Sequence, residues 1–360
     1  MLRFASLLKL GSSAAREAGV PVAAVLTAIL GLAPVALSQG EGLADLLRQG
    51  QAALQTEDFN RAAHVFEQAQ QIDPNRKDVN HGLLLSYLQL GRLTDAESIG
   101  KAAVTRWPND PELRHWLGLA YFKQHKNDLA ISELRQAVKL DPLQYDMHFD
   151  LALVLLADDQ YSDAANELEV AVKLNRRAAL PHVLLGRAYQ NTNRSVQAVE
   201  QFQTASRLEP SLRLVHYHLG FAYESLGRNE EAIAEYEKEI QRSPDNATAL
   251  YQLGHCQLSV GLWKSAVEYL QKAAQLDPGN FDAFYDLGKA LLLKGDAQQA
   301  VPALSRAVEL KPSNPTPHYQ LSRALEKLGK SEEARQELET FTALSKAQPV
   351  TGGMASGPIQ

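Results

Sequence analysis

Small and bulky apolar residues return along this chain at a fixed interval of 34 residues. Alanine occupies one place in nine successive intervals, at Ala62, Ala96, Ala130, Ala164, Ala198, Ala232, Ala266, Ala300 and Ala334. Glycine recurs in a second column, at Gly50, Gly118, Gly186, Gly220, Gly254 and Gly288. Bulky residues such as Phe66, Phe202 and Tyr236 stand between the small ones. Helix axes pack about 8–10 Å apart, so only small side chains fit where two backbones come closest. The pattern therefore predicts closely packed helices.

Each interval is divided by residues that end helices. Prolines recur in a single phase, at Pro74, Pro108, Pro142, Pro210, Pro244, Pro278 and Pro312. Because proline cannot continue the helical hydrogen-bond pattern, it is expected to end the second helix of each interval. Glycine provides a left-handed stop after the first helix, at Gly91, Gly227, Gly261, Gly295 and Gly329, and Asn193 can do the same. Each interval is therefore predicted to be a pair of helices.

These columns resemble the signature of the tetratricopeptide repeat family, W-x2-L-G-x2-Y, then A-x3-F, then P. One interval has His182 in the tryptophan place and otherwise gives Leu185, Gly186, Tyr189, Ala198, Phe202 and Pro210. The match covers nine repeats, at 43–76, 77–110, 111–144, 145–178, 179–212, 213–246, 247–280, 281–314 and 315–348. The resemblance implies an all-α, right-handed superhelix of about 18 helices. It also implies that the first helices line a concave groove.

Two joints between repeats depart from this signature. The repeat that begins at Lys77 has Leu84 in the glycine column and Gly100 where a bulky residue is expected. The repeat that begins at Tyr145 has Ala152 in the glycine column and Arg176 in the place of proline. Since small and bulky places alternate at helix contacts, we expect looser or bent packing near both joints.

The two ends of the chain differ in composition from the repeats. Residues 1–19 contain three basic residues and one acidic residue, and residues 20–37 carry no charge. This order is typical of a signal peptide, which predicts cleavage near Ser38 and export to the periplasm or out of the cell. Two alternatives are an uncleaved membrane anchor through residues 20–37 and a mitochondrial presequence. The tail at 349–360 contains glycine, serine and proline and is expected to be disordered.

Charge and cysteine content narrow the classes of partner. The formal net charge is −6, so no overall basic field attracts nucleic acid, and no nucleic-acid partner is predicted. Cys256 is the only cysteine, which excludes a disulfide within the chain and a cysteine-rich zinc site.

The residues best suited to catalysis or metal binding stand at positions where we expect side chains to pack between helices. Four histidines share one column, at His148, His182, His216 and His318. Equivalent places in neighbouring repeats lie about 10 Å apart, whereas zinc ligands lie about 2 Å from the ion. His255 and Cys256 are adjacent, and adjacent residues on a helix point about 100° apart. We therefore expect no metal, no cofactor, no small-molecule substrate and no enzymatic activity.

Two columns of the first helices are predicted to face the groove. The second half of the chain contributes what we call the tyrosine column, Tyr217, Tyr251, Tyr285 and Tyr319. One helical turn further on lies the cation column, Arg187, Phe221, His255, Lys289 and Arg323. In the first half of the chain the groove-facing positions are predicted to be apolar, with Leu85, Leu119, Phe149 and Leu153. Tyrosine offers a rigid contact surface and arginine pairs with carboxylates, which favours an extended peptide with acidic and apolar side chains.

Several roles remain compatible with this pattern. The leading hypothesis is a non-catalytic scaffold or assembly factor that binds a protein, peptide or helix in its groove. Alternatives are an accessory subunit of an exported or membrane enzyme complex, such as a glycosyltransferase or secretion machinery, and a surface or carbohydrate-binding structural protein. Because tyrosine is common in this column of the family, the tyrosine column could also serve packing alone.

Overall fold

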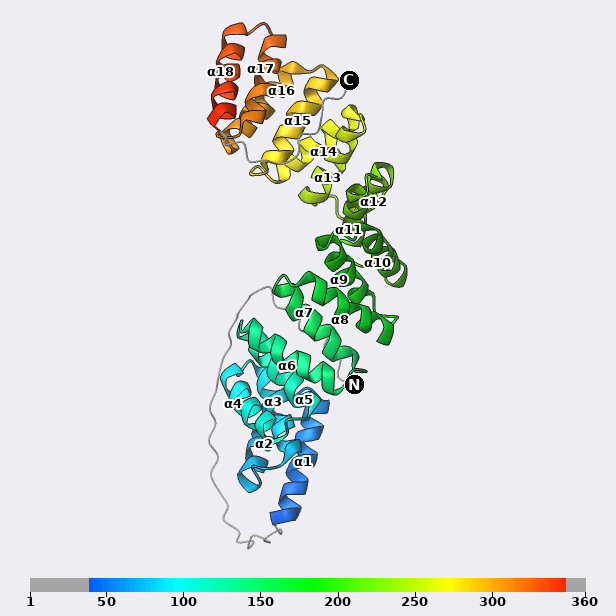
Figure 1. Cartoon of the computed structure of the whole chain (residues 1–360), viewed down its shortest axis with the longest axis vertical. Helices are drawn as coiled ribbons and strands as arrows, with labels where there is room; N and C mark the ends of the chain where they lie inside the picture. Colours follow the sequence, from blue (N-terminus) through cyan, green and yellow to red (C-terminus); the bar gives the residue numbers. More distant parts are fainter. Residues whose placement is uncertain (1–38, 348–360) are drawn as a thin grey trace, which may run out of the picture. The chain divides into compact units, whose positions relative to one another are not determined.

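The computed structural model describes residues 39–347, and every regular element in this range is a helix (Figure 1). The first eight helices are α1 (Gln39–Gln55), α2 (Phe59–Ile72), α3 (Lys77–Leu90), α4 (Leu93–Arg106), α5 (Pro111–Lys123), α6 (Asn127–Leu140), α7 (Tyr145–Ala157) and α8 (Tyr161–Leu174). The next ten are α9 (Ala179–Asn191), α10 (Ser195–Leu208), α11 (Val215–Ser225), α12 (Asn229–Arg242), α13 (Ala247–Ser259), α14 (Trp263–Leu276), α15 (Phe281–Lys294), α16 (Ala297–Leu310), α17 (Pro315–Lys327) and α18 (Ser331–Ala347). The predicted all-α fold of paired helices is confirmed.

The chain divides into two compact units, Met1–Arg176 and Arg177–Gln360. In the described range, unit 1 contains the four helix pairs from α1 to α8, and unit 2 contains the five pairs from α9 to α18. The division falls beside Arg176, which stands where most other repeats have proline.

The turn within each pair adopts the left-handed conformation. The turn residue has a φ between 56° and 93° in all nine described pairs. The predicted residues, Asn193 and the five turn glycines, are confirmed. Glu57, His125 and Asp159 adopt the same conformation, although nothing in their chemistry predicted it. A turn that is fixed by the packing of two helices therefore imposes this conformation on whatever residue occupies it.

The glycine column marks the closest contacts within the pairs. A Cβ built on Gly186 would lie 2.7 Å from Cζ of Phe202, and one built on Gly254 would lie 2.6 Å from Cγ of Leu270. No real side chain tolerates such a distance. The prediction that small residues allow the helices of a pair to approach closely is confirmed.

The first helices of each unit lie closer together than the second helices. In unit 1, α1 contacts α3, α3 contacts α5 and α5 contacts α7, and in unit 2 the first helices from α9 to α17 make the same successive contacts. No successive second helices of the described residues contact each other to a comparable extent. Each unit is therefore curved with its first helices on the inner side. We call this side the first-helix face of that unit.

Several sequence predictions concern residues outside the described range. The leader at 1–38, with its apolar stretch at 20–37, and the tail at 349–360 both lie there. Within residues 39–347, none of the helices combines the length and apolar character needed to cross a membrane.

Candidate protein-binding face

The tyrosine column lies on the first-helix face of unit 2. Tyr217, Tyr251, Tyr285 and Tyr319 come from α11, α13, α15 and α17. The first three are half-buried, and Tyr319 is 41% exposed. Their rings are supported by other aromatic residues, since Tyr285 stacks on Phe281 at 6.0 Å and Tyr319 lies 5.2 Å from Phe341. Each ring of the column therefore lies against another aromatic ring.

Three of these tyrosines interact with the next repeat. Tyr217 interacts with Gln252, Tyr251 with Asp286, and Tyr285 with Gln320. The partner is always 35 residues further along the chain. Burial raises the pKa of each phenol above its ordinary value, and for Tyr251 the carboxylate of Asp286 raises it further. The hydroxyls are therefore neutral at physiological pH, and these three tyrosines already interact with side chains of the next repeat.

The cation column is more exposed than the tyrosines beside it. Arg187, Lys289 and Arg323 are exposed, and Phe221 is 40% exposed. None of the three cations lies within 4.0 Å of a carboxylate oxygen of any residue between 39 and 347. The Arg323 guanidinium lies 5.9 Å from the ring centre of Tyr319. These cations can therefore pair with an incoming anion without first breaking an internal ion pair.

His255 differs from the other members of the cation column because it already has partners. Its Nδ1 lies 2.7 Å from Oδ2 of Asp286, and its Nε2 lies 3.9 Å from Oε1 of Glu224. The hydrogen bond to Asp286 raises the pKa of His255, and burial opposes this effect only in part. His255 and Tyr251 both face Asp286, so this carboxylate links α13 to α15.

In unit 1 the expected apolar residues lie deeper than those of unit 2. Leu119 is 4% exposed and Leu85 is 8% exposed, so both contribute to the core. Phe149 is half-buried and stacks on Tyr145 at 5.6 Å, and Leu153 is also half-buried. Of the four, only Phe149 and Leu153 offer appreciable surface to a partner.

A polar network on the first-helix face of unit 1 was not predicted. His81 on α3 lies 3.3 Å from Oδ2 of Asp110 and 3.2 Å from Oε2 of Glu112. His115 on α5 lies 2.8 Å from Oδ2 of Asp150 on α7. The signal was the placement of these histidines in the same column as the tyrosines, with carboxylates one repeat further on. The pairs His81–Glu112 and His115–Asp150 join successive repeats, as the tyrosines do in unit 2.

The histidine column has a structural role in the packing of each pair. Nδ1 of His148 lies 2.6 Å from Oε2 of Glu167 on α8, and its Nε2 lies 3.1 Å from the carbonyl oxygen of Pro142. His216 and His318 reach Glu235 and Glu337 in the same way. Burial lowers the pKa of His148, but the hydrogen bonds to Glu167 and Pro142 outweigh it and raise the pKa above its ordinary value. Both ring nitrogens are thus engaged in joining the two helices and the preceding loop.

No part of the described structure gathers groups for metal binding. Within residues 39–347, no three His, Cys, Asp or Glu side chains are placed to hold one ion. Cys256 is buried, its Sγ lies 3.5 Å from the carbonyl oxygen of Asn229, and burial raises the pKa of its thiol to about 11. A thiol with a raised pKa is a poor nucleophile at neutral pH.

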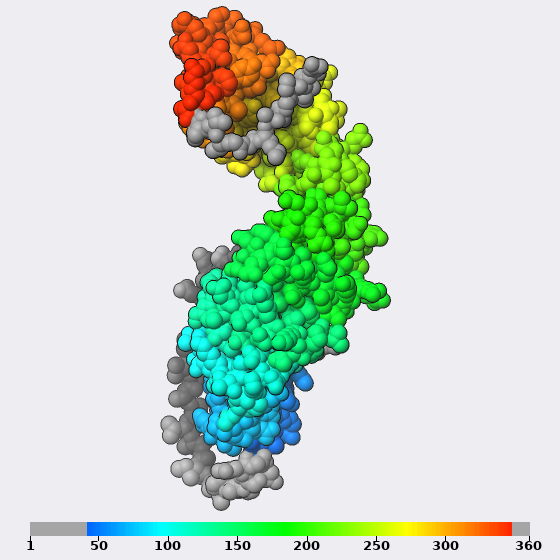
Figure 2. Space-filling model, viewed as in Figure 1, coloured from blue at the N-terminus to red at the C-terminus, as the bar shows by residue number. Residues whose placement is uncertain are grey.

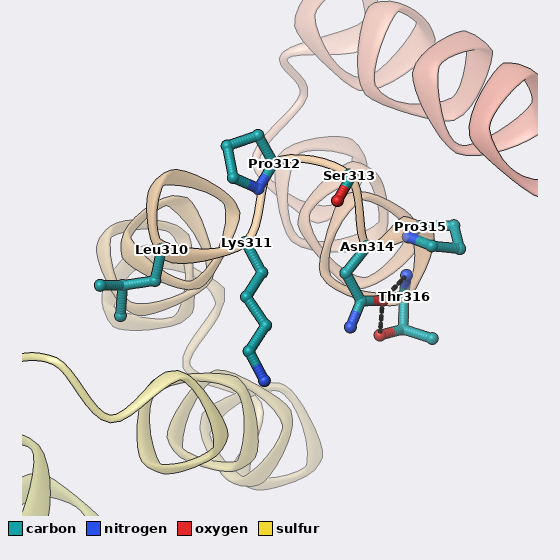
Figure 3. Close-up of a pocket in the computed structure, with 7 residues that line it drawn as sticks. All are labelled: Leu310, Lys311, Pro312, Ser313, Asn314, Pro315 and Thr316. Atoms are coloured by element: carbon teal, nitrogen blue, oxygen red, sulfur yellow. Dashed lines mark hydrogen bonds between the residues drawn. The ribbon is translucent and has the colours of Figure 1, made fainter.

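Three surface hollows among the described residues lie where a loop or turn meets the helices beside it. Side chains fill the spaces between neighbouring helices of each unit (Figure 2). One hollow of about 470 Å³ lies in the loop from Leu310 to Thr316 (Figure 3). There the Asn314 side chain accepts hydrogen bonds from N and Oγ1 of Thr316, at 3.0 and 2.8 Å. Its polar groups therefore cap α17. A second hollow of about 460 Å³ is lined by Phe221 and Val196 and opens beside the cation column.

Comparison with protein families identifies the repeat. A tetratricopeptide repeat model matches residues 47–111, 117–179, 183–247 and 251–315, and a second model of this repeat matches 291–344. The comparison with curated proteins gives no match.

Several solved structures are similar to parts of the chain. YrrB, described as a TPR protein with an unusual peptide-binding site, is 21% identical; the match covers 50% of this chain and 92% of YrrB, with a TM-score of 0.45. MamA from Desulfovibrio magneticus is 22% identical, over 47% of this chain and 96% of MamA, with a TM-score of 0.45. A chain of the APC/C hetero-tetramer Cut9-Hcn1 is 19% identical, over 78% of this chain and 55% of its own length, with a TM-score of 0.46.

Proposed function

Because this chain belongs to the tetratricopeptide repeat family, we propose that it is a non-catalytic scaffold or assembly factor that recruits another protein. The partner binds on the first-helix face of unit 2, as an extended segment with acidic and apolar side chains. In this proposal the first helices line the concave groove of a right-handed superhelix. The family supports the general role, and the chemistry of the face supports the kind of segment.

One observation carries the choice of face. Arg187, Lys289 and Arg323 are exposed without an ion pair among the described residues, beside a set of half-buried tyrosine rings. Exposed cations on this face attract carboxylates, and the rings supply apolar contact at little cost in side-chain entropy. On the corresponding face of unit 1, the carboxylates of Asp110, Glu112 and Asp150 lie against histidines, and Lys77 also pairs with Asp110. The exposed and unpaired cations of unit 2 therefore favour its face for acidic segments.

Selection of random peptides on the full chain tests this proposal. Peptides that bind should be rich in Asp and Glu beside apolar residues, and their affinity should fall as salt is raised. The double variant Lys289→Glu, Arg323→Glu should weaken binding at least tenfold, and Tyr251→Ala with Tyr285→Ala should do the same. A matched control is Lys139→Glu, which changes an exposed lysine on the second helix α6. Binding that survives both double variants would exclude this face.

The same face suits an accessory subunit of an exported or membrane enzyme complex. A pull-down from membrane and periplasmic fractions separates the two roles, since one stoichiometric enzyme partner would favour the accessory subunit. Binding of glycans on an array, lost in Tyr251→Ala, would instead favour a surface or carbohydrate-binding protein.

We also propose that the protein is exported. The support is the sequence of residues 1–38, a basic lead followed by the uncharged stretch at 20–37. N-terminal sequencing of the mature protein tests this proposal. A first residue near Gln39 supports cleavage, and an intact Met1 in a membrane fraction supports anchoring through 20–37.

A further inference from the structure

A buried tyrosine near the end of the first helix is covered by a cation in four repeats. The two residues are five positions apart, on either side of the turn. The cation lies over the ring at 4.1 Å for Arg92 and Tyr87, 5.9 Å for Lys126 and Tyr121, 4.1 Å for Arg194 and Tyr189, and 4.6 Å for Arg228 and Tyr223. This arrangement buries an apolar ring and exposes a charge, as a stable surface requires.

The repeat formed by α13 and α14 reverses this arrangement. Gln257 stands in the tyrosine place, is 4% exposed, and its Oε1 has no hydrogen-bond partner among the described residues. Leu262 stands in the cation place and is 50% exposed. A polar group is thus buried without a partner, and a leucine is exposed above it. Each change opposes stability, and such local violations occur where a surface serves a function.

The exposed leucine belongs to a larger apolar corner. Val260 is 40% exposed and Trp263 is 41% exposed, on either side of Gly261, which fixes the turn with a φ of 84°. We call Val260, Leu262 and Trp263 the α13–α14 corner. Tryptophan is among the residues that contribute most to protein interfaces. Isolated apolar residues are common on surfaces, but here three exposed apolar residues stand within four successive positions.

The charges around the α13–α14 corner indicate the chemistry of its partner. Lys264 follows Trp263 directly, and Lys294 stands in the place of Val260 one repeat further on. Both lysines are exposed and have no ion pair with a described residue. An apolar patch flanked by unpaired cations complements an apolar side chain flanked by carboxylates.

We propose that the α13–α14 corner of unit 2 is a second docking surface, which binds a partner-protein segment carrying an apolar side chain next to Asp or Glu. It is separate from the first-helix face, because its side chains come from the turn and from the start of a second helix. A surface of three side chains is large enough to bind one apolar side chain of a partner, but it is smaller than a stable interface between two copies of this chain.

The decisive variant introduces the arrangement that four other repeats share. Gln257→Tyr with Leu262→Arg buries a ring under a cation, so it should raise the unfolding temperature while removing the docking surface. A random peptide library is selected on the full chain, with counter-selection on this restored variant. We expect enriched peptides with an apolar residue flanked by Asp or Glu, which bind the restored variant and Trp263→Ala at least tenfold more weakly. Leu328→Arg, which changes another exposed turn leucine of unit 2, should leave binding unchanged.

Four outcomes would overturn the proposal. The first is that no peptide distinguishes the natural chain from the restored variant. The second is that binding is lost equally in Tyr251→Ala with Tyr285→Ala, which assigns the peptides to the first-helix face and leaves the proposed function intact. The third is that phosphatidylcholine–phosphatidylglycerol vesicles bind the chain and shift Trp263 fluorescence, with loss in the restored variant. The fourth is a dimer in light scattering that the restored variant converts to a monomer.

Discussion

The ring of Tyr236 on α12 packs so closely against Gly220 on α11 that a Cβ on the glycine would lie 2.7 Å from Cε1 of the ring. Tyr236 is completely buried, and its hydroxyl donates a hydrogen bond to Oε2 of Glu224 at 2.8 Å. The tyrosine is thus fixed at both ends, by a backbone that only glycine provides and by a carboxylate one turn further along α11.

Gly220→Ala should destabilise unit 2 despite the higher helix propensity of alanine. Overpacking costs about 1–3 kcal/mol, and the gain in propensity offsets up to about 1 kcal/mol. We expect faster hydrogen exchange in α11 and α12. The control is Gly42→Ala in α1, where a Cβ would meet nothing within 4 Å, and there exchange should slow. Equal protection in both variants would contradict the packing argument.

His125→Gly should stabilise the turn between α5 and α6. His125 has a φ of 59°, a conformation that L-residues adopt at a cost of about 1–2 kcal/mol. Part of this gain is lost to the greater freedom of glycine in the unfolded chain, which leaves a net effect of about 0.5–1 kcal/mol. Thermal unfolding measures it. The reverse change at an equivalent turn, Gly227→Ala, should lower stability, and a change of the same sign in both variants would exclude backbone strain as the cause.

Glu239→Ala should stabilise the contact between α12 and α13. Glu239 is 2% exposed, and its side chain makes no hydrogen bond or ion pair with a described residue. It occupies a column that holds alanine in seven of the other eight repeats, at Ala69, Ala103, Ala137, Ala171, Ala205, Ala273 and Ala307. A carboxylate that lies in a buried position without an ion-pair partner opposes folding, so its removal should raise the free energy of unfolding in urea by about 1 kcal/mol. Ala205→Glu, at the same place one repeat earlier, should cause a loss. A fall in stability on removing Glu239 would show that it has a stabilising contact.

Unit 2 should lose stability in mildly acidic solution through His218. This ring stacks on Phe202 at 5.4 Å, and burial, with a smaller effect of Arg187, lowers its pKa to about 4. In the unfolded chain histidine protonates near pH 6.5. Between about pH 6.5 and pH 4 the unfolded state therefore binds a proton at His218 that the folded state does not bind. Stability is therefore complete above about pH 6.5 and falls progressively toward pH 4.

Unfolding temperatures between pH 7.5 and pH 4.5 measure this effect. His218→Gln, which cannot protonate, should flatten the pH dependence. His64→Gln, which changes an exposed histidine on α2, should leave it as it is. The same slope in His218→Gln as in the natural chain would assign the acid sensitivity to other groups.

The repeat, its phase and its helix pairs could all be predicted from the order of residues. Gly186 and Phe202 stand 16 residues apart in the same relation as Gly254 and Leu270, and each pair is in close contact. These features can be predicted from a short stretch of sequence. The small residue, the bulky residue and the turn glycine all make their contacts within one helix pair. The residue types of Glu57, His125 and Asp159 did not predict a left-handed conformation. Their positions in the 34-residue repeat, which match those of the turn glycines, do locate these turns.

Which members of a column reach the surface could not be predicted in this way, because it depends on the packing of one repeat against the next. Leu119 and Phe221 occupy equivalent places in their repeats, but the first is 4% exposed and the second 40% exposed. The difference arises from how neighbouring first helices cover each position, which no single repeat encodes. The same holds for His115 and Asp150, which stand 35 residues apart and meet only because one first helix lies against the next. Contacts within a pair follow from its own residues, whereas exposure and links between repeats depend on packing against the next pair.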